Sequence, residues 1–123
     1  MTSVITVCDT CKREGWDAET DPQTDGARLA ALVEVASDAV PEVSVRRHSC
    51  LMGCSHGCNI AIQASGKITY VMGRFEPGEE AAQGIVDYAR AHAASETGQV
   101  PFREWPQAVK GHFVSRIPVL PER

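Results

Sequence analysis

Ser3-Val-Ile-Thr-Val-Cys8-Asp-Thr-Cys11 is the stretch that decides the fold of this chain. Residues 3–7 are short, β-branched and apolar, which predicts a buried strand that ends at Cys8. Val43-Ser-Val-Arg46 alternates between apolar and polar residues and predicts a second strand, which runs into Cys50. Two strands that each lead into cysteines indicate that the fold brings two cysteine loops together.

A helix is predicted between these two strands. Apolar residues recur at helical spacing from Leu29 to Val40, Thr24 or Asp25 can cap the start, and Pro41 ends the pattern. Strands joined in this way should be parallel neighbours connected by a right-handed crossover. The carboxyl ends of parallel neighbours lie at one edge of a sheet, so we expect the two cysteine loops to meet there.

The second half of the chain predicts an antiparallel hairpin and then another helix. Residues 60–63 and 68–72 are short apolar runs, and Ser65-Gly66 suits a two-residue turn. A helix should begin in the acidic, proline-containing segment 76–80 and stop at Gly98.

This order, β-α-β followed by β-β-α, predicts a thioredoxin-like α/β domain over residues 1–98, with a mixed four-stranded sheet flanked by helices. Residues 99–123 are rich in proline and aromatic residues. They are predicted to form a C-terminal extension packed on the same domain, with a short helix near Pro106.

Composition narrows the classes of partner. A chain of 123 residues with a net charge of −4 and a pI near 5.5 predicts one domain that does not bind nucleic acid. No apolar run approaches the roughly 20 residues of a membrane helix, and the start lacks the pattern of a secretory signal. We therefore expect a cytoplasmic protein with no membrane partner, in which clustered thiols are metal ligands or redox groups.

Five cysteines form the clusters Cys8-x2-Cys11 and Cys50-x3-Cys54-x3-Cys58. Four thiolates from two loops can hold zinc or an iron–sulfur cluster. Two C-x2-C pairs would be typical of structural zinc and a C-x2-C-x2-C run of a [4Fe–4S] cluster, and neither occurs here. Two pairs from two loops suit a [2Fe–2S] cluster, while zinc stays an alternative.

A dithiol oxidoreductase that uses Cys8 and Cys11 is the other alternative, because thioredoxins keep their reactive pair after the first strand. The helix start that would activate such a thiol lies about a dozen residues further along the chain, which counts against this alternative.

Cys50-Leu-Met-Gly-Cys-Ser-His-Gly-Cys58, followed by a strand, resembles the second ligand loop of thioredoxin-like [2Fe–2S] ferredoxins and of the small [2Fe–2S] subunit of respiratory complex I. Cys50 and Cys54 match ligand positions there, and Cys8 matches the first ligand. Cys58 falls where those proteins usually have proline. The resemblance implies Cys8, Cys11, Cys50 and Cys54 as ligands, with Cys58 as the rival of Cys11.

The same resemblance implies a homodimer that passes electrons to a redox partner protein and is not an enzyme. Backbone N–H groups of Gly53 and Gly57 are expected near the sulfurs. His92 and His112 lie on helical patterns and are expected at the surface.

The whole chain is also similar to a family of small bacterial metal-binding proteins of unassigned function. The markers are Val7-Cys-Asp-Thr-Cys11, Cys50-Leu-Met-Gly-Cys54, residues 68–77 and residues 100–106 with Arg116-Ile-Pro118. Such genes often accompany cobalamin-biosynthesis genes, which implies a role linked to that process.

Overall fold

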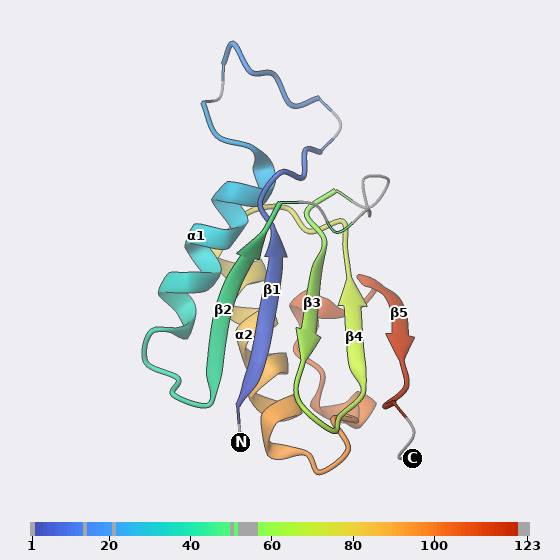
Figure 1. Ribbon diagram of the computed structural model, residues 1–123. Helices are drawn as coiled ribbons and strands as arrows, with labels where there is room; N and C mark the ends of the chain where they lie inside the picture. The colour runs from blue at the N-terminus through green and yellow to red at the C-terminus, as the bar shows by residue number, and fades with distance from the viewer. Residues whose placement is uncertain (1, 14, 21, 50, 52–56, 121–123) are drawn as a thin grey trace.

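A five-stranded mixed sheet forms the centre of the protein, in the order β2-β1-β3-β4-β5, with helices α1 and α2 behind it in Figure 1. The computed structural model describes residues 2–13, 15–20, 22–49, 51 and 57–120. The elements are β1 Ser3–Cys8, α1 Asp25–Ser37, β2 Val43–His48, β3 Ile60–Gln63, β4 Thr69–Met72, α2 Glu79–Ala94, the 3-10 turns η2 Phe102–Glu104 and η3 Gln107–Val109, and β5 Phe113–Ile117. The predicted α/β class is confirmed.

Strands β1 and β2 are parallel and in register, with Ser3 beside Val43 and Cys8 beside His48. Helix α1 connects them, and the Thr24 side chain caps it by accepting a hydrogen bond from the Ala27 N–H at 3.1 Å. The helix ends at Ser37, before the predicted Val40, because the chain already turns at residues 38–42.

Strands β3 and β4 form the predicted antiparallel hairpin, and β3 also pairs with β1. Helix α2 begins at Glu79, with extended Gly78 as its N-cap, and ends at Ala94. Gly98 lies beyond this end with φ of +85°, a left-handed conformation that glycine adopts without strain.

The fifth strand differs from the prediction of a four-stranded sheet. β5 pairs antiparallel with β4, with Thr69 beside Ile117. Pro118 follows this strand directly, yet an edge strand tolerates a nearby proline because one of its sides needs no partner. The short helix expected near Pro106 is the 3-10 turn η3.

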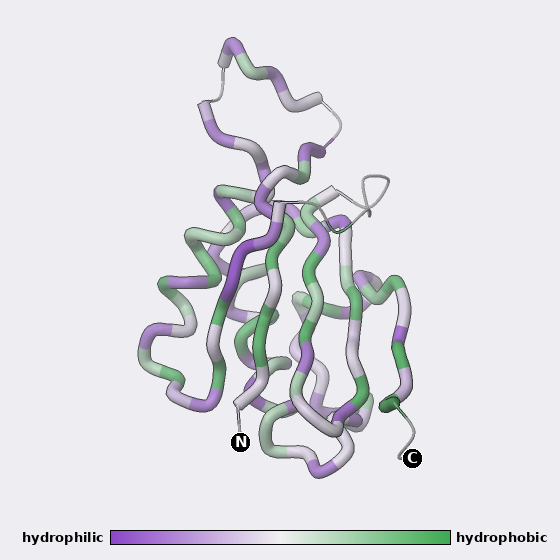
Figure 2. The backbone as a smooth tube through the Cα atoms, viewed as in Figure 1, coloured by the Kyte–Doolittle hydropathy of each residue, from purple (hydrophilic) through white to green (hydrophobic). Residues whose placement is uncertain are grey.

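Both helices cover the same face of the sheet, as Figure 1 shows. The side chains of Ile5, Val7, Ile60 and Ile62 are fully buried and form the core with the helices. Figure 2 shows a hydrophilic stretch at the end of β2, where Arg46, Arg47 and His48 occur. The start of β1 and the end of β5 lie at one end of the sheet, and Cys8, at the end of β1, lies at the other. In the described part of the chain, no helix is long and apolar enough to cross a bilayer.

Candidate functional site

The first cysteine loop is joined to both ends of the second. The Asp9 N–H donates to the His48 carbonyl at 3.1 Å, the Cys8 N–H donates to the Asn59 carbonyl at 3.2 Å, and the Thr10 hydroxyl donates to the Ser49 carbonyl. The predicted meeting of the two loops is therefore confirmed for the described residues. Cys50 and Cys54 lie outside the described residues, so their part in a ligand quartet stays a prediction.

The Cys8 and Cys11 side chains are 2% and 5% exposed and hydrogen-bond to each other. Burial alone would raise the pKa of Cys8, but hydrogen bonds from Cys11, the Leu51 N–H and Thr10 outweigh it and lower that pKa below its ordinary value. Burial, followed by the hydrogen bond with Cys8, raises the pKa of Cys11 to about 11. Of the two thiols, Cys8 therefore loses its proton more readily than Cys11.

Backbone N–H groups of the second loop point at the first pair of thiols. The Leu51 N–H donates to Cys8, and the N–H groups of Cys58 and Asn59 donate to Cys11. The Gly57 carbonyl accepts the Arg74 N–H at 3.0 Å, and the expected place of the Gly57 N–H near the sulfurs stays a prediction. Gly53 lies outside the described residues. Several N–H donors around thiolate sulfurs are the environment that tunes thiolate metal centres.

The start of helix α1 packs directly on the loop between Cys8 and Cys11. The Gly26 N–H donates to the Cys11 carbonyl at 2.9 Å, and a Cβ at Gly26 would lie 2.0 Å from the Cys8 carbonyl oxygen. The Asp25 carboxylate accepts the Arg13 N–H at 2.6 Å. The helix start is thus a dozen residues away in sequence but in contact in space, so its distance along the chain does not count against a dithiol role.

Cys58 is fully buried and belongs to the hydrophobic core. Burial, then the negative charges of Asp25 and Cys11, raises the pKa of Cys58 to about 12, so its thiol stays protonated. Its φ of +62° is rare for a residue with a side chain. These features fit the expectation that Cys58 is the thiol that does not bind the metal. Cys58 nevertheless lies close enough to Cys11 for the Cys11 charge to raise its pKa.

The cations beside the cysteine loops are mostly engaged. Arg46 Nε donates to Thr6 Oγ1 at 2.7 Å, and Arg47 forms an ion pair with Glu34 at 2.7 Å. Lys12 Nζ lies 4.8 Å from the Trp16 ring centre. Such contacts are typical of surface charges.

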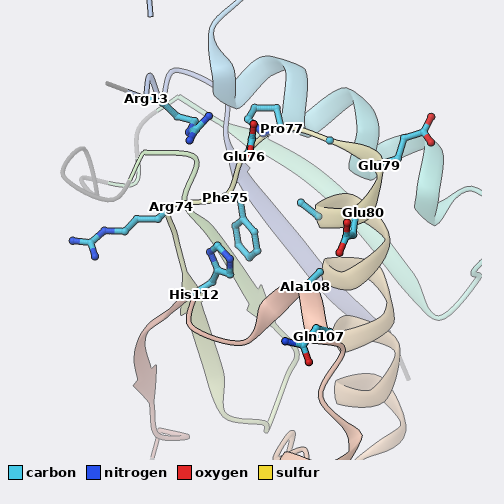
Figure 3. A pocket seen from close by; sticks show the side chains of 12 residues that line it. Arg13, Arg74, Phe75, Glu76, Pro77, Glu79, Glu80, Gln107, Ala108 and His112 are labelled. Carbon is cyan, nitrogen blue, oxygen red and sulfur yellow. The ribbon is translucent and has the colours of Figure 1, made fainter. Parts of the chain in front are cut away.

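A cavity of about 560 Å³ adjoins the first cysteine loop and opens between Arg13, the segment 74–81 and residues of η3. Figure 3 shows the rings of Phe75 and His112 at its centre, and these rings stack with centroids 4.4 Å apart. Arg74 points outward from the cavity in that view. Arg74 has a φ of +63°, and its N–H donates a hydrogen bond to the Gly57 carbonyl. This hydrogen bond connects the wall of the cavity to the second cysteine loop.

His92 is fully buried, so the expectation that it lies at the surface is wrong. Its Nδ1 lies 2.7 Å from the Ser3 hydroxyl, and its Nε2 lies 2.7 Å from the Ile68 carbonyl oxygen. The helical pattern could not reveal these partners, because they come from β1 and from the start of the hairpin's second strand. His112 is half-buried and lies outside any helix.

The sequence pattern did not indicate that two further residues, Gly26 and Asn59, belong to this region. Gly26 follows a capping pair and gave no sign that it contacts the cysteine loop. Asn59 directly follows Cys58, and its side chain is buried without a hydrogen-bond partner in the described part of the chain. An asparagine between a cysteine and an apolar strand was the available signal, since such a position usually holds an apolar residue.

The residues present fit a thiolate metal centre in their chemistry. Within the described residues, no three Cys, His, Asp or Glu side chains converge as a metal site. That part of the chain contains only Cys8 and Cys11 of the four expected ligands. A pair of buried thiols that shares backbone N–H donors suits soft or borderline metals such as iron and zinc.

A family model described as "Protein of unknown function (DUF1636)" matches residues 5–119. No curated protein and no solved structure matches the chain. The match spans β1 to β5 and includes all five cysteines.

Proposed function

Since the chain belongs to this family of unassigned function, we propose from its own geometry that it is an electron-transfer protein that binds a [2Fe–2S] cluster through Cys8, Cys11, Cys50 and Cys54. The observation that carries the proposal is the set of backbone N–H groups from Thr10, Leu51, Cys58 and Asn59 around two buried thiols. The link to cobalamin biosynthesis that the family resemblance implies is part of this proposal.

A bound [2Fe–2S] group would supply a one-electron site, which suits transfer of an electron between a reduced and an oxidised partner protein with no bond made or broken. Cys8 and Cys11 would hold one side of the group as thiolates. The donors from both loops offset the negative charge of these thiolates, and the low exposure of the pair limits access of water.

Anaerobic purification tests the proposal directly. We expect a red-brown protein with about two irons and two sulfides per chain and visible absorption that bleaches on reduction by dithionite. Single Cys→Ser variants at positions 8, 11, 50 and 54 should lose iron, whereas Cys58→Ala should keep it. A colourless protein with one zinc per chain would support the zinc alternative, and iron kept by C11S but lost by C58A would replace Cys11 by Cys58 as a ligand.

A dithiol oxidoreductase is the second candidate, and the unequal pKa values of Cys8 and Cys11 favour it. The Cys8 thiolate would attack a disulfide and release one thiol. Cys11 would then displace the mixed disulfide, which gives a Cys8–Cys11 disulfide and a second thiol, a two-electron reaction. The 2% exposure of Cys8 opposes this role, because the attacking sulfur must be reached. Rapid exchange of the metal-free protein with glutathione disulfide, lost in C8S, would support it.

The proposal includes a homodimer formed at the β5 edge of the sheet. Most large apolar side chains that are exposed in the described part of the chain lie in or beside this strand: Phe102, Val114, Ile117, Val119 and Leu120. The free edge of β5 can pair with a second copy. Sedimentation velocity should show a dimer that Ile117→Lys converts to a monomer. Val35→Lys, an exposed position on α1, is the control and should leave the dimer intact.

A further inference from the structure

Asn59 has a buried side-chain amide with no hydrogen-bond partner among the residues that the structure describes. The residue is 2% exposed, and neither Oδ1 nor Nδ2 is paired within that part of the chain. Leaving such a group unpaired is costly, so native proteins satisfy it with a protein partner, an ordered water or a bound group. The buried Tyr88 hydroxyl differs, because it interacts with the Tyr70 side chain within an aromatic cluster that includes Phe113.

The amide lies at the cysteines. β1 and β3 pair Val7 with Ile60, and the Cys8 N–H bond to the Asn59 carbonyl continues this antiparallel register by one step. Residues directly opposite on antiparallel strands project to the same face, with Cβ atoms about 4.5–5.5 Å apart. Ile60 points into the core, so Asn59 shares the other face with Cys8.

The backbone of Asn59 already serves this site, because its N–H donates to Cys11. Asn59 therefore stands opposite one thiol and donates to the other. Its side chain adds a further donor to this region, and that donor has no acceptor among the described residues.

We propose that the Nδ2–H of Asn59 donates a hydrogen bond to the sulfur atoms of the bound cluster, an inference that rests on the proposed function. Asn59 is a positioning residue that tunes the cluster through its sulfurs. A hydrogen bond to sulfur stabilises the more negative, reduced state more than the oxidised state, so it raises the reduction potential.

Asn59→Leu keeps the size of the side chain and removes the donor. We expect N59L to bind iron as the wild type does, but to show an equilibrium constant for one-electron reduction about tenfold lower, a shift of about 59 mV. A spectroelectrochemical titration measures the shift, and the electron paramagnetic resonance signal of the reduced state should change with it. Gln63→Leu is the matched control, because Gln63 ends β3 on the same face and pairs with Val4, further from Cys8, and the potential of this variant should not change.

The metal-free protein gives a second measurement that does not depend on the cluster. Because N59L removes an unpaired amide, the metal-free variant should resist urea at least as well as the wild type does. A metal-free N59L that is clearly less stable would overturn the inference, since the amide would then have a structural partner. An unchanged potential in iron-loaded N59L would overturn this inference alone, whereas a wild type that binds no iron would overturn it together with the proposed function.

Discussion

Gly26 offers the sharpest test of how the cysteine loop is held. In Gly26→Ala, the new Cβ would lie 2.0 Å from the Cys8 carbonyl oxygen, whereas ordinary contact begins at 3.4 Å. The start of α1 must therefore retreat by about 1.4 Å, which lengthens the 2.9 Å bond from the Gly26 N–H to the Cys11 carbonyl beyond hydrogen-bond range.

The cost has three parts. Overpacking costs about 1–3 kcal/mol, loss of one hydrogen bond about 1 kcal/mol and disturbance of the Thr24 cap about 1 kcal/mol. Alanine returns about 0.5–1 kcal/mol because it restricts the unfolded chain. We expect G26A to lower the free energy of unfolding by about 2–4 kcal/mol, a large share of the stability of a small domain.

Urea unfolding of the metal-free protein measures this loss, and the rate at which a thiol reagent modifies Cys11 reports whether the loop has opened. Gly78→Ala is the control, because its Cβ would meet only the Glu76 oxygen at an ordinary 3.8 Å and its backbone is extended. We expect G78A to stay within about 1 kcal/mol of the wild type. If G26A is as stable as G78A and its Cys11 is modified equally slowly, the contact between Gly26 and the Cys8 carbonyl does not support the loop.

Three further predictions concern stability. Burial lowers the pKa of His92 below its ordinary value of about 6.5. As the pH falls through 6.5, the unfolded chain therefore binds a proton that the folded chain does not bind, and stability present above pH 6.5 is lost. Urea unfolding at pH 7.5 and 5.5 should show a smaller loss of stability in His92→Gln than in the wild type, and equal losses would contradict the assignment to His92. Lys67 Nζ donates hydrogen bonds at the end of α2 to the carbonyls of His92 at 3.1 Å and Ala93 at 2.7 Å. Lys67→Met removes these hydrogen bonds and should lower the free energy of unfolding by about 1.5–3 kcal/mol. An unchanged thermal midpoint would show that they add nothing to stability. Glu34→Gln breaks an exposed ion pair with Arg47 and should cost at most about 1 kcal/mol in urea, so a loss above 2 kcal/mol would mean that the pair does more than screened surface charges do.

The core of the fold was predictable because its signals are local. β-branched runs, helical spacing from Leu29 and a glycine turn at Ser65-Gly66 each depend on neighbouring residues, and each predicts an element that the structure contains. The meeting of the two cysteine loops then follows from one general rule, that parallel neighbours end at the same edge of a sheet.

What the sequence could not reveal depends on contacts between distant residues. β5 pairs with β4 although prolines surround it, and His92 finds Ser3 across most of the chain. The contact of Gly26 with the Cys8 carbonyl likewise exists only after α1 has folded back on β1. The contact at Gly26 is part of the environment of the thiols, so cysteine spacing predicts candidate ligands but could not reveal their surroundings.

Ser3 and Ile117, near the two ends of the chain, lie at the end of the sheet opposite Cys8. A protein attached to an electrode or a resin through either terminus would therefore present its cysteine end to the solution. Attachment through either terminus should therefore give dissolved reagents the same access to the cysteine end. This arrangement makes surface voltammetry and pull-down experiments practical with tags at either end.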